Sequence, residues 1–201
     1  MTEKTYKAIL EDLVFALSIM SEYNDRYTSG HQHRVSCIAV EISKEMELDE
    51  ERIESIKIAG LLHDIGKCSV PREILTKPNK LSFTEFKLIQ EHVMAGYNIL
   101  KGINFPWPVA DIVLQHHEDE AGMTGYPQRL RGDEILPEAK ILRVADTVEA
   151  MASPRPYRPA LGIEAALKEI ELNSGKMYNP RVAEACLKVY AKKVVDNREC
   201  S

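Results

Sequence analysis

The sequence predicts an all-α fold, and three observations indicate it. Apolar residues recur at intervals of three and four in one segment after another, as they do on the buried face of a helix. Residue types that begin helices stand between these segments, among them Asp49, Ser82 and Pro137. No stretch of useful length has the alternation of apolar and polar residues that is typical of a strand.

The first half of the chain is expected to contain three helices before residue 65. Residues 5–22 carry one apolar stripe at helical spacing, and residues 31–46 carry a second. Asp49 is a common N-cap residue type and begins the third helix. The small residues Ala59 and Gly60 near the end of that helix allow another helix to approach closely.

The second half is expected to be helical as well. Ser82 and Glu85 have the spacing of a capping box, which begins a helix that we expect to run to about Leu100. Pro108 restarts the chain as a helix, and Pro137 begins another. The last two helices are expected at residues 163–172 and 180–195.

Composition and charge exclude several classes of protein. The chain has 201 residues, of which 44% are hydrophobic and 28% charged, which suits one globular domain with a small N-terminal extension. A net charge of -5 does not favour DNA, RNA or an anionic membrane as a partner. With no signal peptide or transmembrane segment in the sequence, we expect a soluble cytoplasmic protein. Four scattered cysteines are expected to be ordinary reduced thiols: Cys37, Cys68, Cys186 and Cys200.

Seven side chains that can bind metal ions lie at or near the apolar sides of separate helical segments. They are His31, His63, Asp64, His92, His116, His117 and Asp146. A single histidine in such a place is more often a hydrogen-bonded core residue, but seven such groups would need several dedicated hydrogen-bond networks. One metal cluster satisfies all of them together. The number of ligands suits two octahedral ions that share a carboxylate and a water, and the mixture of imidazole and carboxylate favours iron or manganese.

The same residues carry a resemblance to a known family. The motifs, in order, are His31-x-x-Arg34, His63-Asp64-x-Gly66-Lys67, His92-x-x-x-Gly96, His116-His117-Glu118, Gly125-Tyr126-Pro127, Ala145-Asp146 and Arg155-Pro-Tyr-Arg158. Together they resemble HD-GYP domains, which belong to the HD superfamily of metal-dependent phosphohydrolases, over residues 28–190. The resemblance implies an HD-superfamily helical bundle with HD-GYP additions. From the resemblance together with the helical pattern of the first residues and the polar C-terminus, we expect an N-terminal helix at 1–22, an HD-GYP catalytic domain at 23–195 and a frayed tail at 196–201.

The resemblance also implies roles for individual residues. Asp64 would bridge two metal ions. The other ligands would be His31, His63 and Asp146 at one ion and His92, His116 and His117 at the other. Asp64 and Lys67 would be the catalytic residues, with Lys67 stabilising charge on the phosphate or on the leaving oxygen.

Substrate contacts are implied in the same way. Arg155 and Arg158 would bind the substrate phosphates, and Tyr126 would shape the pocket for a guanine base. The alternative for Arg155, Tyr157 and Arg158 is a solvated turn. His33 has no role in the family and is expected at the surface.

Three positions depart from the family pattern. The loop from Glu118 to Pro127 is one residue longer and lacks the Asp-Gly of the usual Asp-Gly-x-Gly-Tyr-Pro, which predicts a changed loop structure and changed substrate contacts. Tyr27 stands where members with a third metal carry Glu, which predicts two metal ions. Glu149 replaces the usual Asp three residues after Asp146, a conservative change beside the ligands.

The implied function is hydrolysis of cyclic di-GMP to pGpG by a metal-bridging hydroxide. Whether hydrolysis continues to GMP stays open. One alternative is a phosphohydrolase of another nucleotide, which the Gly-Tyr-Pro and Arg-Pro-Tyr-Arg stretches disfavour. The other is a catalytically weak domain that senses a cyclic dinucleotide or a partner protein, which the intact ligand set disfavours. A related substrate such as cyclic GMP-AMP, a homodimer through residues 5–22 and signalling partner proteins stay open.

Overall fold

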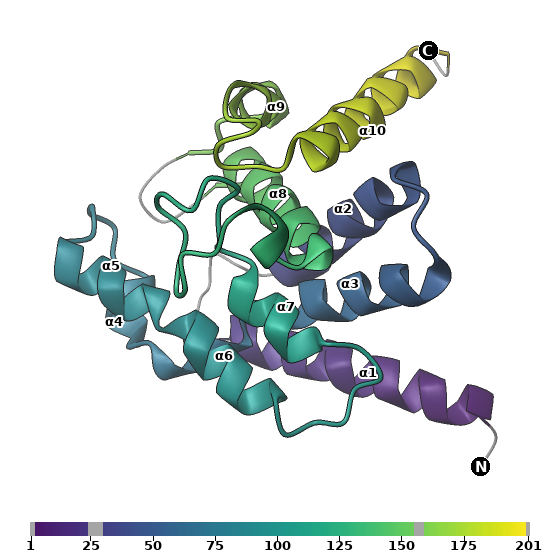
Figure 1. Ribbon diagram of the computed structural model, residues 1–201. Helices are drawn as coiled ribbons and strands as arrows, with labels where there is room; N and C mark the ends of the chain where they lie inside the picture. Colours follow the sequence, from purple (N-terminus) through teal and green to yellow (C-terminus); the bar gives the residue numbers. More distant parts are fainter. Residues whose placement is uncertain (1–2, 24–29, 155–158, 200–201) are drawn as a thin grey trace.

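The computed structural model describes residues 3–23, 30–154 and 159–199, and its regular structure there is helical (Figure 1). The elements are α1 (Glu3–Glu22), α2 (His31–Glu45), α3 (Glu50–Leu62), the 3-10 helix η1 (Ile65–Ser69), α4 (Arg72–Leu75), α5 (Phe83–Gln90), α6 (His92–Leu100), α7 (Val109–Gln115), the 3-10 helix η2 (Gly132–Glu134), α8 (Pro137–Ala152), α9 (Ile163–Leu172) and α10 (Pro180–Glu199). Within these ranges the only β-type pairing is an isolated bridge between Ser174 and Tyr178. The all-α prediction is confirmed.

The core lies where α2, α3 and α8 pack against one another, with α7 closing one end (Figure 1). Its largest fully buried apolar side chains are Ile42, Ile56, Leu62, Leu100, Ile112, Ile141, Leu142 and Ile170. Burial of a side chain of this size contributes roughly 2 kcal/mol. The histidines His31, His63, His92 and His116 are buried to the same degree, so the polar site is built into this core.

Local sequence signals set several of the helix boundaries. Asp49 caps α3 by accepting a hydrogen bond from the amide of Arg52 at 2.9 Å. Ser82 and Glu85 form the predicted capping box at the start of α5. The absence of a side chain at Gly60 lets α2 pack closely, because a Cβ there would lie 2.8 Å from the Cα of Ser36. The expected close approach at this position is confirmed.

One predicted helix is divided in the structure. The single helix expected from Ser82 to Leu100 is wrong, because α5 ends at Gln90 and α6 begins at His92. At the junction the carbonyl of Ile89 accepts the Nδ1 hydrogen of His92, at 2.6 Å. In an unbroken helix that carbonyl would accept from the backbone amide four residues later. The helix is therefore interrupted at the point where the His92 imidazole binds the backbone.

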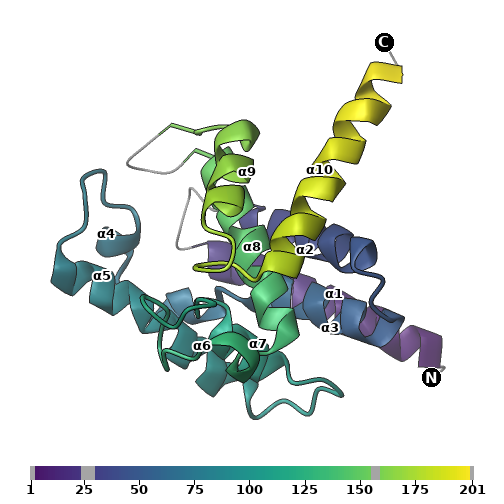
Figure 2. The ribbon, with the colours of Figure 1, turned by 45° about the horizontal axis from the view of Figure 1, so that its top comes forward.

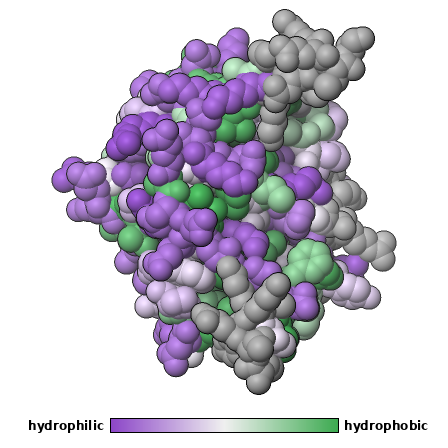
Figure 3. Space-filling view, turned by 90° about the vertical axis from the view of Figure 1, so that its right-hand side faces the viewer, coloured by the Kyte–Doolittle hydropathy of each residue, from purple (hydrophilic) through white to green (hydrophobic). Residues whose placement is uncertain are grey.

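The two terminal helices lie at the periphery. α1 packs across α3 and buries Val14, while Ile9, Leu13 and Met20 remain exposed. α10 begins beside α8 and α9, and its C-terminal part projects away from the other helices (Figure 2). Figure 3 shows a face on which hydrophilic residues predominate and hydrophobic ones form small separate patches. Among the described residues there is no helix with the length and apolar character needed to cross a membrane.

Candidate metal centre

The pair His63-Asp64 directly follows two buried leucines at the end of α3. Just after the pair, at Gly66, the chain comes close to α6. A Cβ at Gly66 would lie 1.9 Å from the carbonyl oxygen of His92. Glycine at this position therefore allows the first turn of α6 to contact the chain just after Asp64. The result is that Nε2 of His92 lies 3.4 Å from Oδ1 of Asp64.

Three buried imidazoles share one hydrogen-bonding pattern. The Nδ1 atoms of His63, His92 and His116 contact the carbonyls of residues 60, 89 and 113 at 2.8, 2.6 and 2.6 Å. Each contact requires the ring hydrogen on Nδ1 and leaves a lone pair on Nε2. All three Nε2 atoms are buried and have no hydrogen-bond partner among the described residues. A metal ion is the partner that fits three such lone pairs, since histidine ligands commonly donate their other nitrogen to a carbonyl or carboxylate.

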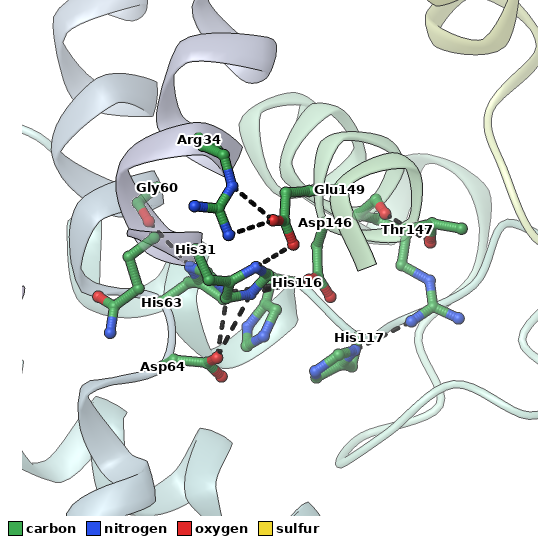
Figure 4. Close-up of polar contacts among 12 residues, drawn as sticks. His31, Arg34, Gly60, His63, Asp64, His116, His117, Asp146, Thr147 and Glu149 are labelled. Atoms are coloured by element: carbon green, nitrogen blue, oxygen red, sulfur yellow. Dashed lines mark hydrogen bonds and ion pairs between the residues drawn. The ribbon is translucent and has the colours of Figure 1, made fainter. Parts of the chain in front are cut away.

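The carboxylate of Asp64 faces two groups of side chains, and Figure 4 shows its contacts with His31 and His63 in the first of them. Its Oδ2 atom lies 3.6 Å from Nε2 of His31 and 3.5 Å from Nε2 of His63, whereas its Oδ1 atom faces His92. The first group is His31, His63 and Asp64, and the second is His92, His116 and His117. Within each group one ligand atom from every residue lies within 4.8 Å of the others.

Asp146 completes the set of seven predicted residues. Its Oδ1 atom lies 3.3 Å from Nε2 of His31 and 4.0 Å from Nε2 of His63. The structure thus brings together all seven side chains, from α2, the end of α3, α6, the end of α7 and α8. The division into two groups is the one that the family resemblance implies.

The protonation states of the ligand set suit cation binding except at His31. Burial alone would lower the pKa of His31, but hydrogen bonds to Asp146 and Glu149 outweigh it and raise the pKa. Burial raises the pKa of Asp64, but the charges of Lys67 and the nearby histidines outweigh it and hold the pKa well below its usual value. Asp146 behaves likewise, because hydrogen bonding to His31 offsets its burial and lowers its pKa. Burial is the main cause that lowers the pKa of His63, His92 and His116. Ionised carboxylates and neutral imidazoles are the forms that bind metals.

His31 is oriented by a carboxylate on the side opposite Asp64 (Figure 4). Its Nδ1 atom contacts Oε2 of Glu149, while Oε1 of Glu149 accepts from Nε of Arg34 at 2.8 Å and from Oγ of Ser153 at 2.7 Å. Burial raises the pKa of Glu149, but these hydrogen bonds outweigh it and lower the pKa to about 2. Glu149, which stands where the family usually has Asp, thus contacts the predicted ligand His31 directly.

The Gly-Tyr-Pro loop covers the second group. The ring of Tyr126 stacks on that of His117, with centroids 4.7 Å apart and planes inclined by 24°. Glycine precedes it because a Cβ at Gly125 would lie 2.5 Å from the amide nitrogen of Asp119. Nδ1 of His117 accepts a hydrogen bond from Nη1 of Arg143 at 2.9 Å. Sequence reasoning missed Arg143, and no motif signals it.

Asp119 holds the altered loop together. Its carboxylate accepts from the amides of Met123, Thr124 and Gly125 at 2.9, 2.6 and 2.6 Å, and from the hydroxyl of Thr124 at 2.8 Å. The loop without the usual Asp-Gly is therefore closed by Asp119, the second residue of the loop. The local sequence does not mark this contact, because Asp119 is followed directly by Glu120 and Ala121 and its partners lie four to six residues further on.

The remaining predicted residues fall in three places. Nζ of Lys67 lies 2.5 Å from Oδ2 of Asp64, at the edge of the first group. Arg155, Arg158 and Tyr27 lie outside the described residues. His33 is exposed and contacts the ring of Phe15, as expected for a surface residue.

Fold and site together define a helical domain with two adjoining groups of side chains that could bind metal ions. A family model described as HD domain matches residues 16–182, and the chain belongs to that family. The resemblance to HD-GYP domains expected from the motifs is confirmed.

Individual relatives agree with this assignment. A cyclic di-GMP phosphodiesterase of Thermotoga maritima is 40% identical over 193 residues, which are 95% of this chain and 52% of the relative. A 3'3'-cGAMP-specific phosphodiesterase 3 of Vibrio cholerae is 34% identical over 90% of this chain and 39% of its own length. The chain thus spans about half the length, or less, of these curated relatives.

Solved structures share the fold. An HDG"Y"P protein from Bdellovibrio bacteriovorus superposes with a TM-score of 0.67 at 18% identity, over 80% of this chain and 51% of that one. At this identity the likeness concerns the fold alone.

Proposed function

We propose that this chain is the catalytic domain of a phosphodiesterase that hydrolyses cyclic di-GMP with two divalent metal ions. The observation that carries the proposal is a set of three buried imidazole Nε2 atoms, on His63, His92 and His116, that have no hydrogen-bond partner in the described part of the chain. Two of them lie beside the carboxylate of Asp64. An unsatisfied buried polar atom costs about 1–3 kcal/mol, so an apolar core has no reason to hold three of them together.

Each ion is proposed to bind one of the two groups. Asp64 would be shared, because its two oxygens face different groups. The other ligands would be His31, His63 and Asp146 at the first ion and His92, His116 and His117 at the second. The mixture of imidazole and carboxylate supports iron or manganese over calcium or magnesium.

Two ions held in this way supply a nucleophile at neutral pH and stabilise the attacking and leaving oxygens of a phosphoryl displacement. The residues of this chain contribute charge and orientation. Lys67 places an ammonium beside Asp64, where it can stabilise charge that develops on the phosphate. Tyr126 covers one face of His117 and limits the space on that side of the second group.

The substrate proposal depends on the relatives and on the motifs. The named relatives act on cyclic di-GMP or on 3'3'-cGAMP, and the second compound is the alternative substrate. Arg155 and Arg158, which lie outside the described residues, are proposed to bind the phosphates because guanidinium groups suit phosphate geometry. Residues 23–195 are proposed as the catalytic domain.

The test combines metal analysis with turnover on one anaerobically purified sample. We expect two ions per chain and hydrolysis of cyclic di-GMP. We expect Asp64→Asn to lose both, because the shared ligand loses its charge. Asp133→Asn is the matched control, since it removes an exposed carboxylate in η2 away from the ligands.

Other outcomes distinguish the alternatives. Binding of cyclic dinucleotides without turnover, at full metal content, would favour a sensor. Faster turnover of 3'3'-cGAMP than of cyclic di-GMP would change the substrate and keep the site. A protein that takes up no metal would contradict the proposal.

A further inference from the structure

His117 differs from the other buried imidazoles in the partner of its Nδ1 atom. In His63, His92 and His116 this atom donates to a backbone carbonyl. In His117 it lies 2.9 Å from Nη1 of Arg143. A guanidinium has only donors and stays charged, so Nδ1 of His117 must be the acceptor.

This hydrogen bond conflicts with metal binding by the same ring. A neutral imidazole carries one N–H, and if Nδ1 accepts from Arg143 the hydrogen must be on Nε2. Nε2 then has no lone pair for a cation. A ligand bond from His117 through Nε2 therefore requires that the bond to Arg143 be broken, whereas the other three imidazoles are already in the form that a metal needs.

The guanidinium of Arg143 already has one nitrogen without a partner in the described part of the chain. Arg143 lies on α8, one turn before Asp146, and its backbone carbonyl accepts from the hydroxyl of Thr147 at 3.0 Å. The nitrogen without a partner is Nε, which is buried. Breaking the bond to His117 would therefore leave a second nitrogen of this guanidinium to be satisfied.

The charges act in the same direction. Both groups adjoin the carboxylate of Asp64, but the first also has the carboxylate of Asp146, whereas the second has the guanidinium of Arg143 beside His117. A divalent cation entering the second group lies near the guanidinium that binds His117 and meets its positive charge.

We infer that the two metal sites fill unequally, and that Arg143 is the positioning residue that makes the site at His92, His116 and His117 the weaker one. The inference rests on the proposed function, because it presupposes two divalent ions. It adds an order of loading, with the site at His31 and His63 filled first.

The test is an equilibrium titration with Mn²⁺ under anaerobic conditions, comparing the unaltered chain with Arg143→Met. We expect two dissociation constants for the unaltered chain. In Arg143→Met the weaker site should tighten by about tenfold, the scale of effects from residues that orient metal ligands. The tighter site should not change.

Arg181→Met is the matched control, because it removes the same charge from an exposed position on α10. It should leave both constants as they are. A second site that is unchanged or weaker in Arg143→Met overturns the inference and leaves the proposed function intact. Failure of both proteins to bind two ions overturns the proposed function together with the inference.

A second measurement uses only the unaltered, metal-free protein and so does not depend on the folding of a variant. Long-range nitrogen–proton correlation spectra of the histidine rings report which nitrogen carries the hydrogen. We expect Nε2 for His117 and Nδ1 for His63, His92 and His116. The Nδ1 form for His117 would overturn the inference.

Discussion

The substitution Gly66→Ala tests how closely α6 must approach the His-Asp pair. The added Cβ would lie 1.9 Å from the carbonyl oxygen of His92 and 2.5 Å from the amide nitrogen of Gly96. Both atoms belong to the backbone, so no side-chain rotation relieves the contact. Reaching 3.0 Å from the His92 oxygen requires a movement of 3.0 − 1.9 = 1.1 Å.

That movement acts at the first turn of α6, which carries His92. A displacement of about 1 Å at a catalytic group costs on the order of 100-fold in rate. The overpacking itself costs about 1–3 kcal/mol of stability. We therefore expect turnover of cyclic di-GMP to fall on the order of 100-fold, with a lower metal content and a lower melting temperature.

The assays are hydrolysis, metal analysis and thermal unfolding followed by circular dichroism. Gly102→Ala is the control, because a Cβ there meets no atom within 4 Å. It should match the unaltered chain in all three. Normal metal content and turnover in Gly66→Ala would refute the reasoning from this close contact.

Three further predictions concern groups that support the site and the fold. Glu149→Gln should weaken metal binding about 10- to 100-fold at the site of His31, whose Nδ1 it contacts, and Mn²⁺ titration measures this; equal weakening of both sites would contradict the assignment. Asp119→Ala should raise KM for cyclic di-GMP with metal content unchanged, because the loop that carries Tyr126 loses its carboxylate acceptor; an unaltered KM would show that the loop does not need it. Glu85→Gln should lower the melting temperature at neutral pH, where hydrogen bonds first from Lys77 and then from Ser82 lower the pKa of Glu85 from 4.5 to about 2. A lowered pKa contributes stability above pH 4.5 that is lost as pH falls towards 2, so the two melting temperatures should converge over that range, and a constant gap would contradict the assignment.

Much of the fold follows from local signals in the sequence. Asp49 and the Ser82–Glu85 capping box begin helices where predicted, because a cap satisfies backbone amides within its own turn. The break at Glu91 could not be predicted in this way. It accompanies a hydrogen bond from the imidazole of His92 to the backbone, and this bond competes with helix continuation.

The seven candidate ligands could be predicted because their residue types are unusual on apolar helix faces. Their neighbours could not. Arg143 lies beside His117 only after α8 packs against the end of α7, and nothing in the local sequence marks that contact. Asp119 stands before the position of the usual Asp-Gly, so comparison with the family pattern indicates that the loop has lost its aspartate. In the structure, the carboxylate of Asp119 accepts hydrogen bonds from the loop amides.

The most direct test of the central claim is a crystal structure of the manganese-loaded chain with an anomalous difference map. Two peaks are predicted, one beside His31, His63 and Asp146 and the other beside His92, His116 and His117, with the carboxylate of Asp64 between them. A single peak, or peaks away from Asp64, would contradict the assignment of two ions to these seven side chains.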